Sequence, residues 1–404
     1  MSPDNTRPST GCHARIMKIL LATDTYYPDV NGAAYFTYRL ATLLAKRGHN
    51  VSVMCPSRSF RNTVSNDKDV TVYGIRSIPV PIYRNFRISP LFISGAVAGA
   101  VREISPDIIH IQNHFLIGKE VVSAANKLGI PVIGTNHFMP ENLVHYLHLP
   151  LIAARWAQKL AWKQFVRVFE HLDFVTTPTK TAATLLVKAG LHKDVVPVSC
   201  GIDLERFKPS NDGLYLKRKF AIPTDKPVLL YVGRLDKEKR IDIILRALPD
   251  ISRVTSVHLV IAGLGKEKQN LEELTEKLGV QKAVTFTGFV PDADLQNIYR
   301  IADLFVTAGI AELQSIVTME AMASGLPVVA VNAMALPELV HDGENGYLFS
   351  DGDSRMLAKR IIAILANQAM RDEMSRKSLE IIRNHDINRI IEKYESIYSQ
   401  TINR

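Results

Sequence analysis

The amino-acid sequence predicts an α/β protein built from two doubly wound, Rossmann-like domains that face a cleft. Short apolar runs alternate with helical patterns along the chain, which is typical of parallel sheets covered by helices. The 404 residues are enough for two domains of roughly 200 residues each. Hydrophobic residues make up 47% of the chain, which excludes a disordered or fibrous protein.

In the first half, five apolar runs predict buried strands, and one helical pattern lies between the first two runs. The strands are expected at Ile16–Ala22, Asn50–Cys55, Asp107–Ile111, Pro131–Gly134 and Phe174–Thr177. A helix is expected over Ala33–Arg47, because Gly48 ends the pattern. Residues 1–15 are expected to form a flexible tail rather than a signal peptide, since they contain no apolar core.

The second half repeats the pattern after a segment without clear periodicity. That segment, Pro197–Asn211, is interpreted as the linker, so the domains are expected to cover residues 16–205 and 206–404. Ligands in such sheets bind at the carboxyl ends of the strands. The strands of the second half are expected at Val228–Val232, Val257–Ala262, Val284–Phe286, Leu304–Val306 and Val328–Val331.

Charge and cysteine content narrow the class of protein. The net charge of +9 indicates an anionic partner, such as a nucleotide sugar, an anionic membrane or nucleic acid. Cys12, Cys55 and Cys200 are too few and too scattered for a disulfide framework or a zinc site, which favours a reducing, cytoplasmic setting. No run of about eighteen apolar residues is free of charge, so no transmembrane helix is expected.

Two glutamates in the C-terminal half, Glu312 and Glu320, stand eight positions apart. A helix is expected over Glu320–Ser324, stopped by Gly325, and Glu312 lies on the loop that enters it. The N-terminus of a helix attracts anions through its free backbone N–H groups and its dipole. A phosphorylated ligand there would have a carboxylate on each side for sugar hydroxyls. The alternative is a pair of surface glutamates on an ordinary helix.

Four further candidates lie close to the ends of expected strands or the start of a helix. Arg234 and Lys239 follow one strand, so both could bind and stabilise the negative charge of a phosphorylated ligand. Gly32 directly precedes the first helix and lets the backbone approach a phosphate or sugar without a Cβ. His137 follows a strand and could form a hydrogen bond with a ligand in the cleft. The alternatives are a solvated basic loop, a turn glycine and a structural histidine.

In their order along the chain, these motifs resemble those of retaining family 4 glycosyltransferases of the GT-B fold. The resemblance runs nearly end to end and implies an acceptor-side first domain, a nucleotide-sugar-binding second domain and a last helix, residues 388–400, that crosses back onto the first. Two residues depart from the family pattern: Ser315 replaces a usual glycine, and Cys200 replaces a common asparagine. The segments that carry the resemblance are Tyr27–Ala33, Gly201–Phe207, Tyr231–Arg240 and Glu312–Gly325.

The resemblance also implies roles for these residues. Glu312 would hold donor-sugar hydroxyls and Glu320 the ribose hydroxyls, while Arg234, Lys239 and His137 complete the catalytic set. No metal and no cofactor are expected, since the two cations take the place of a metal ion. The sequence itself contains no P-loop and no metal-ligand spacing. The expected donor-binding residues are Gly32, Gly263, Val290, Ser315, Ile316, Val317 and Glu320.

The segment Leu147–Asp173 predicts an amphipathic helix, in which basic residues recur every four positions beside tryptophans. Such helices lie in anionic membrane interfaces, and the alternative is an ordinary packed helix with its tryptophans in the core. The preceding stretch, His137–Tyr146, resembles bacterial diacylglycerol glucosyltransferases. The expected membrane and acceptor residues are Arg155, Trp156, Lys159, Trp162, Lys163 and Arg167.

Together, these features predict a retaining hexosyltransferase that is cytoplasmic and peripheral on the inner face of the plasma membrane. Its donor would be a nucleoside diphosphate sugar of the UDP-glucose or GDP-mannose type, and its acceptor a membrane lipid such as diacylglycerol or a glycolipid. The alternatives are transfer to a soluble sugar or polysaccharide, a GT-B-type nucleotide-sugar epimerase, and a binding module without catalysis. Nucleic acid is not expected as a partner.

Overall fold

The computed structural model describes residues 15–29, 31–80, 83–90, 92–140 and 151–404. The chain divides into two compact units, Met1–Ile133 and Gly134–Arg404, with the division inside strand β8 (Val132–Thr135). Most strands pair in parallel and are separated by helices, so the predicted α/β fold class is confirmed. The predicted domain limits, 16–205 and 206–404, stay a prediction.

The first unit contains a largely parallel sheet with the strand order β7-β1-β2-β4-β3. Strands β1 and β7 are almost entirely buried, which is why their sequences are continuous apolar runs. The antiparallel β3 is exposed and a separate ribbon pairs β5 with β6. The strands are β1 (Lys18–Ala22), β2 (Asn50–Pro56), β3 (Thr63–Asp67), β4 (Val70–Ile75), β5 (Ile78–Val80), β6 (Tyr83–Ile88) and β7 (Ile108–Ile111).

The helices of the first unit are α1 (Gly32–Lys46), α2 (Ser94–Ile104) and α3 (Leu116–Leu128). Helix α1 begins after Asn31, whose side-chain oxygen accepts a hydrogen bond from the Ala34 backbone N–H at 2.9 Å. Helix α1 contacts β2 and β4, whereas α3 contacts β1 and β2. The loops after β1 and β7 therefore lead directly into helices, as expected for a parallel α/β sheet.

In the second unit, β9 (Phe174–Thr177) lies between β8 and β10 (Val195–Pro197). The same unit contains a six-stranded sheet with the order β13-β12-β11-β14-β15-β16, in which every printed pairing is parallel. Its strands are β11 (Val228–Val232), β12 (His258–Ala262), β13 (Val284–Gly288), β14 (Leu304–Thr307), β15 (Val328–Val331) and β16 (Gly346–Phe349).

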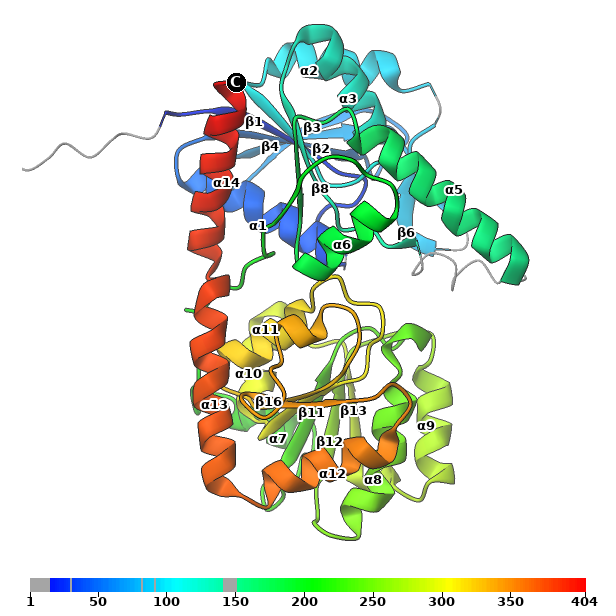
Figure 1. The fold of residues 1–404 in the computed structure, drawn as a ribbon, viewed down its shortest axis with the longest axis vertical. Helices are drawn as coiled ribbons and strands as arrows, with labels where there is room; N and C mark the ends of the chain where they lie inside the picture. Colours follow the sequence, from blue (N-terminus) through cyan, green and yellow to red (C-terminus); the bar gives the residue numbers. More distant parts are fainter. Residues whose placement is uncertain (1–14, 30, 81–82, 91, 141–150) are drawn as a thin grey trace, which may run out of the picture. The chain divides into compact units, whose positions relative to one another are not determined.

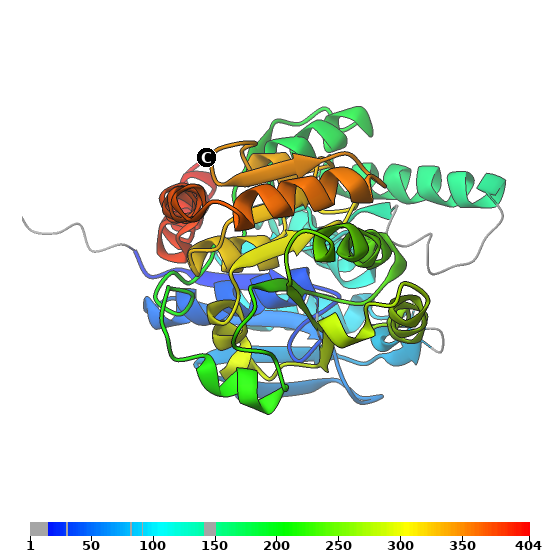
Figure 2. The same cartoon turned by 90° about the horizontal axis from the view of Figure 1, so that it is seen from below.

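Helices connect these strands. Helices α8 and α12 pack against each other, α8 contacts β14, and α12 contacts β15 and β16 (Figures 1 and 2). Short 3₁₀ segments η1 (Lys237–Lys239), η2 (Gln281–Ala283), η3 (Leu336–Glu338) and η4 (Arg383–His385) lie between them. The helices are α5 (Leu151–Phe169), α6 (Lys180–Lys188), α7 (Leu214–Lys219), α8 (Ile241–Ser252), α9 (Lys268–Lys277), α10 (Asp292–Arg300), α11 (Ile316–Ala323), α12 (Ser354–Leu365), α13 (Gln368–Ile382) and α14 (Ile387–Ile402).

Helices α13 and α14 follow one another along the chain, with η4 between them (Figure 1). The buried Tyr394 of α14 places its hydroxyl 3.2 Å from the Thr135 hydroxyl of β8. Gly201 adopts a φ of +69°, and a Cβ there would lie 2.6 Å from the Ile387 side chain, so only glycine fits at this contact. Helix α14 therefore packs on the segment that contains β8–β10.

Candidate functional site

Arg234 follows β11 and is anchored by two carboxylates. Its guanidinium forms ion pairs with Asp236 and, at 2.9 Å, with Glu238, which is only 4% exposed. The Tyr231 hydroxyl donates a hydrogen bond to the Arg234 carbonyl at 2.9 Å. These contacts fix the guanidinium of Arg234, and they also neutralise carboxylates that would otherwise be buried without a counter-ion.

Lys239, at the end of η1, contacts Glu312 directly. The ammonium nitrogen lies 2.5 Å from Glu312 Oε1, and both side chains are mostly buried. The backbone packs tightly here, since a Cβ at Gly309 would lie 3.1 Å from the same oxygen. Two residues predicted for one site, and separated by 73 positions, are thus brought together.

Glu320 lies on α11, but this helix begins at Ile316, four positions earlier than the sequence suggested. The Tyr299 hydroxyl donates a hydrogen bond to Glu320 Oε2 at 2.6 Å. Burial, with a smaller contribution from the Glu320 charge, holds the pKa of Tyr299 well above its usual value. The phenol therefore keeps its proton and remains a donor to the carboxylate.

Ser315 occupies the N-cap position of α11 with a φ of −90° and is 2% exposed. Because this φ is ordinary for a residue with a side chain, serine fits where the family commonly has glycine. Its hydroxyl accepts a hydrogen bond from the Thr318 hydroxyl at 2.8 Å and is therefore turned toward the helix. Ile316 and Val317 form the first turn, and both are half-buried.

The remaining donor-binding candidates of the second unit lie in loops after strands. Gly263 has a φ of +149°, and a Cβ there would lie 1.8 Å from the Gly233 carbonyl oxygen, so no other residue fits. Val290 follows β13 and is 7% exposed. Gly263 thus allows the loops after β11 and β12 to approach closely.

His137 lies two positions beyond the end of β8 and is partly accessible. Burial of the imidazole lowers its pKa to about 3, so the ring is neutral at physiological pH. A neutral ring can donate from one nitrogen and accept at the other. This fits the predicted hydrogen-bonding role. The His137–Tyr146 segment lies outside the described residues from 141 onward.

In the first unit, Gly32 is the first residue of α1. The nearby Asp24 is 6% exposed and accepts a hydrogen bond from the Ile117 backbone N–H at 3.2 Å. Burial raises the pKa of Asp24 to about 7. Asp29 instead pairs with Arg58 at 3.0 Å. Within the described ranges, no group of three or more histidine, cysteine, aspartate or glutamate side chains is arranged to hold a metal ion.

Helix α5 covers Leu151–Phe169 of the predicted segment, and residues 147–150 lie outside the described ranges. The aromatic side chains of this helix differ in burial: Phe165 and Phe169 are fully buried, whereas Trp156 is 69% exposed. Ile152 and Leu160 are also exposed, at 75% and 68%, so an apolar stripe with a spacing of four reaches the surface. The basic residues Arg155, Lys159, Lys163 and Arg167 are exposed as well.

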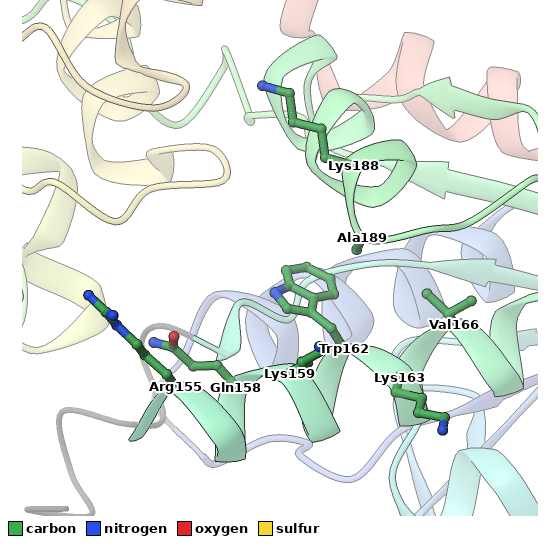
Figure 3. Close-up of a pocket in the computed structure, with 8 residues that line it drawn as sticks. All are labelled: Arg155, Gln158, Lys159, Trp162, Lys163, Val166, Lys188 and Ala189. Atoms are coloured by element: carbon green, nitrogen blue, oxygen red, sulfur yellow. The ribbon is translucent and has the colours of Figure 1, made fainter. Parts of the chain in front are cut away.

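A groove of about 620 Å³ lies between α5 and α6 (Figure 3). Trp162 points from α5 toward Ala189, while Lys163 and Lys188 point away from one another (Figure 3). The cations along this groove therefore do not converge on one point. In the part of the chain that the structure describes, no helix is both long and apolar enough to cross a membrane.

The sequence analysis did not identify the residues that form ion pairs or hydrogen bonds with the predicted site residues. Asp236 and Glu238 lie two and four positions after Arg234, a spacing that could have suggested ion pairs. Nothing in the local sequence points to Tyr299 as the partner of Glu320, because the two come from different helices. The expected roles of all these site residues remain predictions.

The sequence matches known families and relatives over most of its length. The family described as Glycosyltransferase Family 4 matches residues 30–206, and the one described as Glycosyl transferases group 1 matches residues 215–380. The alpha-monoglucosyldiacylglycerol synthase of Streptococcus pneumoniae is 31% identical over 393 residues, covering 94% of this chain and 85% of that protein. The GDP-mannose-dependent alpha-mannosyltransferase of Corynebacterium glutamicum is 25% identical over 372 residues, covering 92% and 86%.

Solved structures share the fold. Sucrose-phosphate synthase from Thermosynechococcus elongatus aligns with a TM-score of 0.77 at 20% identity, covering 95% of this chain and 98% of that one. Anabaena HepE in complex with UDP-glucose aligns with a TM-score of 0.75 at 19% identity, covering 95% and 99%. These alignments support the expected GT-B architecture of two Rossmann-like domains.

Proposed function

Because this chain belongs to the family 4 glycosyltransferases of the GT-B fold, we propose that it is a retaining hexosyltransferase with a nucleoside diphosphate sugar as donor and a membrane lipid as acceptor. The proposal of a nucleoside diphosphate sugar as donor rests mainly on the contact between Lys239 and Glu312, which lies on the loop leading into α11. Lys239 can bind a phosphate and Glu312 can accept hydrogen bonds from sugar hydroxyls, and both lie close to the N-terminus of a helix, which attracts anions.

Each residue has a distinct task in the proposed transfer. Arg234 and Lys239 stabilise the negative charge that develops on the diphosphate as the bond to the sugar breaks. Glu312 accepts hydrogen bonds from hydroxyls of the transferring sugar, and Glu320 from those of the ribose. His137, neutral at physiological pH, donates a hydrogen bond to the sugar. The two cations supply the charge that a metal ion would otherwise provide, so we propose a metal-independent reaction.

The donor class and the stereochemistry are supported by the similar proteins. A neighbour of the same fold was crystallised with UDP-glucose, and two relatives are named as an alpha-monoglucosyldiacylglycerol synthase and an alpha-mannosyltransferase. The sugar in UDP-glucose and GDP-mannose is itself alpha-linked to phosphate, so an alpha-linked product means retention at the anomeric carbon. This supports a retaining reaction with a UDP-glucose or GDP-mannose type donor.

The lipid acceptor is supported by two observations. The relatives from Streptococcus pneumoniae and Acholeplasma laidlawii, at 31% and 28% identity, are named as monoglucosyldiacylglycerol synthases. In addition, α5 presents the exposed stripe of Ile152, Trp156 and Leu160 beside basic side chains, a composition suited to an anionic membrane surface. We therefore propose peripheral attachment to the inner face of the plasma membrane.

A donor-release assay tests this function. The protein is incubated with UDP-glucose, UDP-galactose and GDP-mannose, with vesicles that contain or lack diacylglycerol, and free UDP or GDP is measured. We expect release from one donor to depend on diacylglycerol and to be lost in Lys239→Ala. Release that depends on a soluble sugar instead would support transfer to a soluble acceptor. Conversion of the donor into a different nucleotide sugar without any acceptor would indicate an epimerase and contradict the proposal.

A further inference from the structure

Three neighbouring strands of the second unit end at one edge. Strand β9 lies between β8 and β10, and its register with β10 places Pro197 beside Thr177. The residues two positions beyond the strand ends are His137, Thr179 and Ser199. The Asn136 backbone N–H donates to the carbonyl of β9 at Thr176, at 2.9 Å, which fixes the start of the His137 loop against β9.

The donor loop, defined as Glu312–Ser315, contacts this edge at two consecutive residues. The Thr179 hydroxyl donates a hydrogen bond to the Leu313 carbonyl at 2.8 Å. The side-chain oxygen of Gln314 accepts from the Cys200 backbone N–H at 2.7 Å and from the Ser199 hydroxyl at 3.2 Å. The loop after β9 thus holds the donor loop through the Leu313 backbone, and the loop after β10 holds it through the Gln314 side chain.

The Ser199 hydroxyl is itself held in place. It accepts a hydrogen bond from the Gly201 backbone N–H at 3.1 Å and lies 2.8 Å from His385 Nδ1. The Ser199 hydroxyl lies within hydrogen-bond distance of both Gln314 Oε1 and His385 Nδ1, so it links the two side chains. Burial lowers the pKa of His385, which agrees with a neutral ring. Hydrogen bonds therefore connect His385, Ser199 and Gln314.

We propose that Gln314 is a positioning residue for glycosyl transfer. By joining the donor loop to the edge that includes His137, it sets the position of Glu312 relative to that histidine. The inference rests on the proposed function, in which these two residues bind the transferring sugar. Loss of the Gln314 oxygen leaves the buried Cys200 N–H without its acceptor and releases one of the two attachments. Small displacements of positioning groups slow transfer more than they weaken ligand binding.

The test is Gln314→Met, which keeps the length of the side chain and removes both polar atoms. We expect kcat to fall at least about 10-fold, while UDP still binds one-to-one with a Kd within about 3-fold of the wild type. Ser199→Ala, which keeps the Cys200 contact, should lower kcat by about 3- to 10-fold. The double variant should be slower than Gln314→Met alone by less than the factor that Ser199→Ala causes by itself, because the two changes share the contact between Gln314 and Ser199. The matched control is Gln269→Met on the exposed face of α9, with unchanged kcat.

Several results would overturn the inference. These are a kcat within about 2-fold of the wild type in Gln314→Met, an equal loss of UDP binding and kcat, or a double variant whose loss is the product of the two single losses. If Gln314→Met fails to fold, Ser199→Ala decides: a normal kcat there contradicts the proposed positioning. Failure of the proposed function is distinguishable, because the wild type itself would then transfer no sugar from any donor.

Discussion

The Lys239 ammonium and the Glu312 carboxylate form an ion pair at 2.5 Å, with side chains only 18% and 14% exposed. A diphosphate that binds Lys239 must therefore share or replace the Glu312 carboxylate. The pair keeps each charge neutralised in the absence of ligand, and it couples the phosphate and sugar ends of the donor site. This coupling leads to the first prediction.

Glu312→Gln should tighten the binding of UDP while it slows transfer. Without the competing carboxylate, Lys239 binds the diphosphate more strongly, by about 2- to 5-fold in Kd, as expected for a partly screened ion pair. The kcat should fall by about 10²-fold, because the sugar loses its carboxylate partner. Calorimetric titration with UDP measures the first effect. Asp294→Asn, which breaks the exposed pair with Lys219, should leave the Kd for UDP unchanged. A weaker Kd in Glu312→Gln would contradict the competition.

Lys239→Ala and Arg234→Ala should each lower kcat by about 10²- to 10³-fold, because each removes charge stabilisation of the transition state. The two variants should differ in stability. Arg234 is the ion-pair partner of the buried Glu238, so its loss should lower the melting temperature as well. Arg234→Lys keeps the positive charge, so it serves to separate the effect on kcat from the effect on the melting temperature. Arg253→Ala, at an exposed ion pair, is the control. Near-normal kcat in both alanine variants would rule out the leaving-group role.

Transfer should continue in excess EDTA. In the proposed mechanism, Arg234 and Lys239 provide the positive charge at the diphosphate, so chelation has nothing to remove. Initial rates are compared with and without EDTA after extensive dialysis. Loss of activity that Mg²⁺ or Mn²⁺ restores would instead direct attention to Asp24 and Asp29 as metal ligands.

The protein should sediment with phosphatidylglycerol vesicles through α5. Each basic residue near an anionic surface adds about 1 kcal/mol, so four on one stripe supply several before Trp156 is counted. Replacement of all four by glutamine should abolish co-sedimentation without reducing donor hydrolysis in solution. Binding should also weaken as ionic strength rises. The four residues are Arg155, Lys159, Lys163 and Arg167.

A matched pair of double variants controls for net charge. Arg155→Gln with Lys159→Gln on α5 should weaken sedimentation, whereas Arg355→Gln with Lys359→Gln, at the same spacing on the exposed side of α12, should not. Equal effects of the two double variants would mean that overall charge, and not α5, drives binding. If the wild type does not sediment at all, a soluble acceptor becomes the better hypothesis.

Asp24→Asn should flatten the pH dependence of stability. In the unfolded chain Asp24 ionises near pH 3.8, whereas the folded group keeps its proton up to about pH 7. The folded state therefore binds more protons between these values, and the free energy of unfolding falls as the pH rises from about 4 to 7. Asparagine does not titrate, so the free energy of unfolding of Asp24→Asn relative to the wild type should rise by about 2.5 kcal/mol between pH 5 and 8. Urea unfolding at both pH values measures the free energy of unfolding. The same change in that free energy between pH 5 and 8 in the variant and the wild type would contradict the prediction.

The buried parallel strands were predictable, because both of their faces are covered and their sequences are continuous apolar runs. All ten expected strands are present, with limits within two residues. Several of the strands that escaped prediction are exposed or short, whereas β4, with six residues, is partly buried. Strand β3, for example, has almost no buried residue, so its sequence has no apolar run, and β10 covers only three residues.

The site was predictable in its charged residues but not in their contacts. Glu312 and Lys239 are each visible from spacing and residue type, but their pairing depends on how β11 and β14 lie in the sheet. Helix α11 begins earlier than expected because Ile316 to Met319 are apolar or β-branched, and their burial outweighs a weak local preference for helix. Gln314 looks like an ordinary loop residue until its partners Cys200 and Ser199 are known.

The packing of α14 on β8 has a consequence for synthesis of the protein. The contact between Thr135 and Tyr394 joins residues 259 positions apart, and Tyr394 and Tyr398 are fully buried in it. Domains usually fold as they leave the ribosome, in order from the N-terminus. Here the region around β8 and β9 must wait, partly uncovered, until nearly all of the remaining chain has been translated. Translation speed over the intervening segment therefore sets how long these apolar strands are exposed to chaperones and to aggregation in the cell.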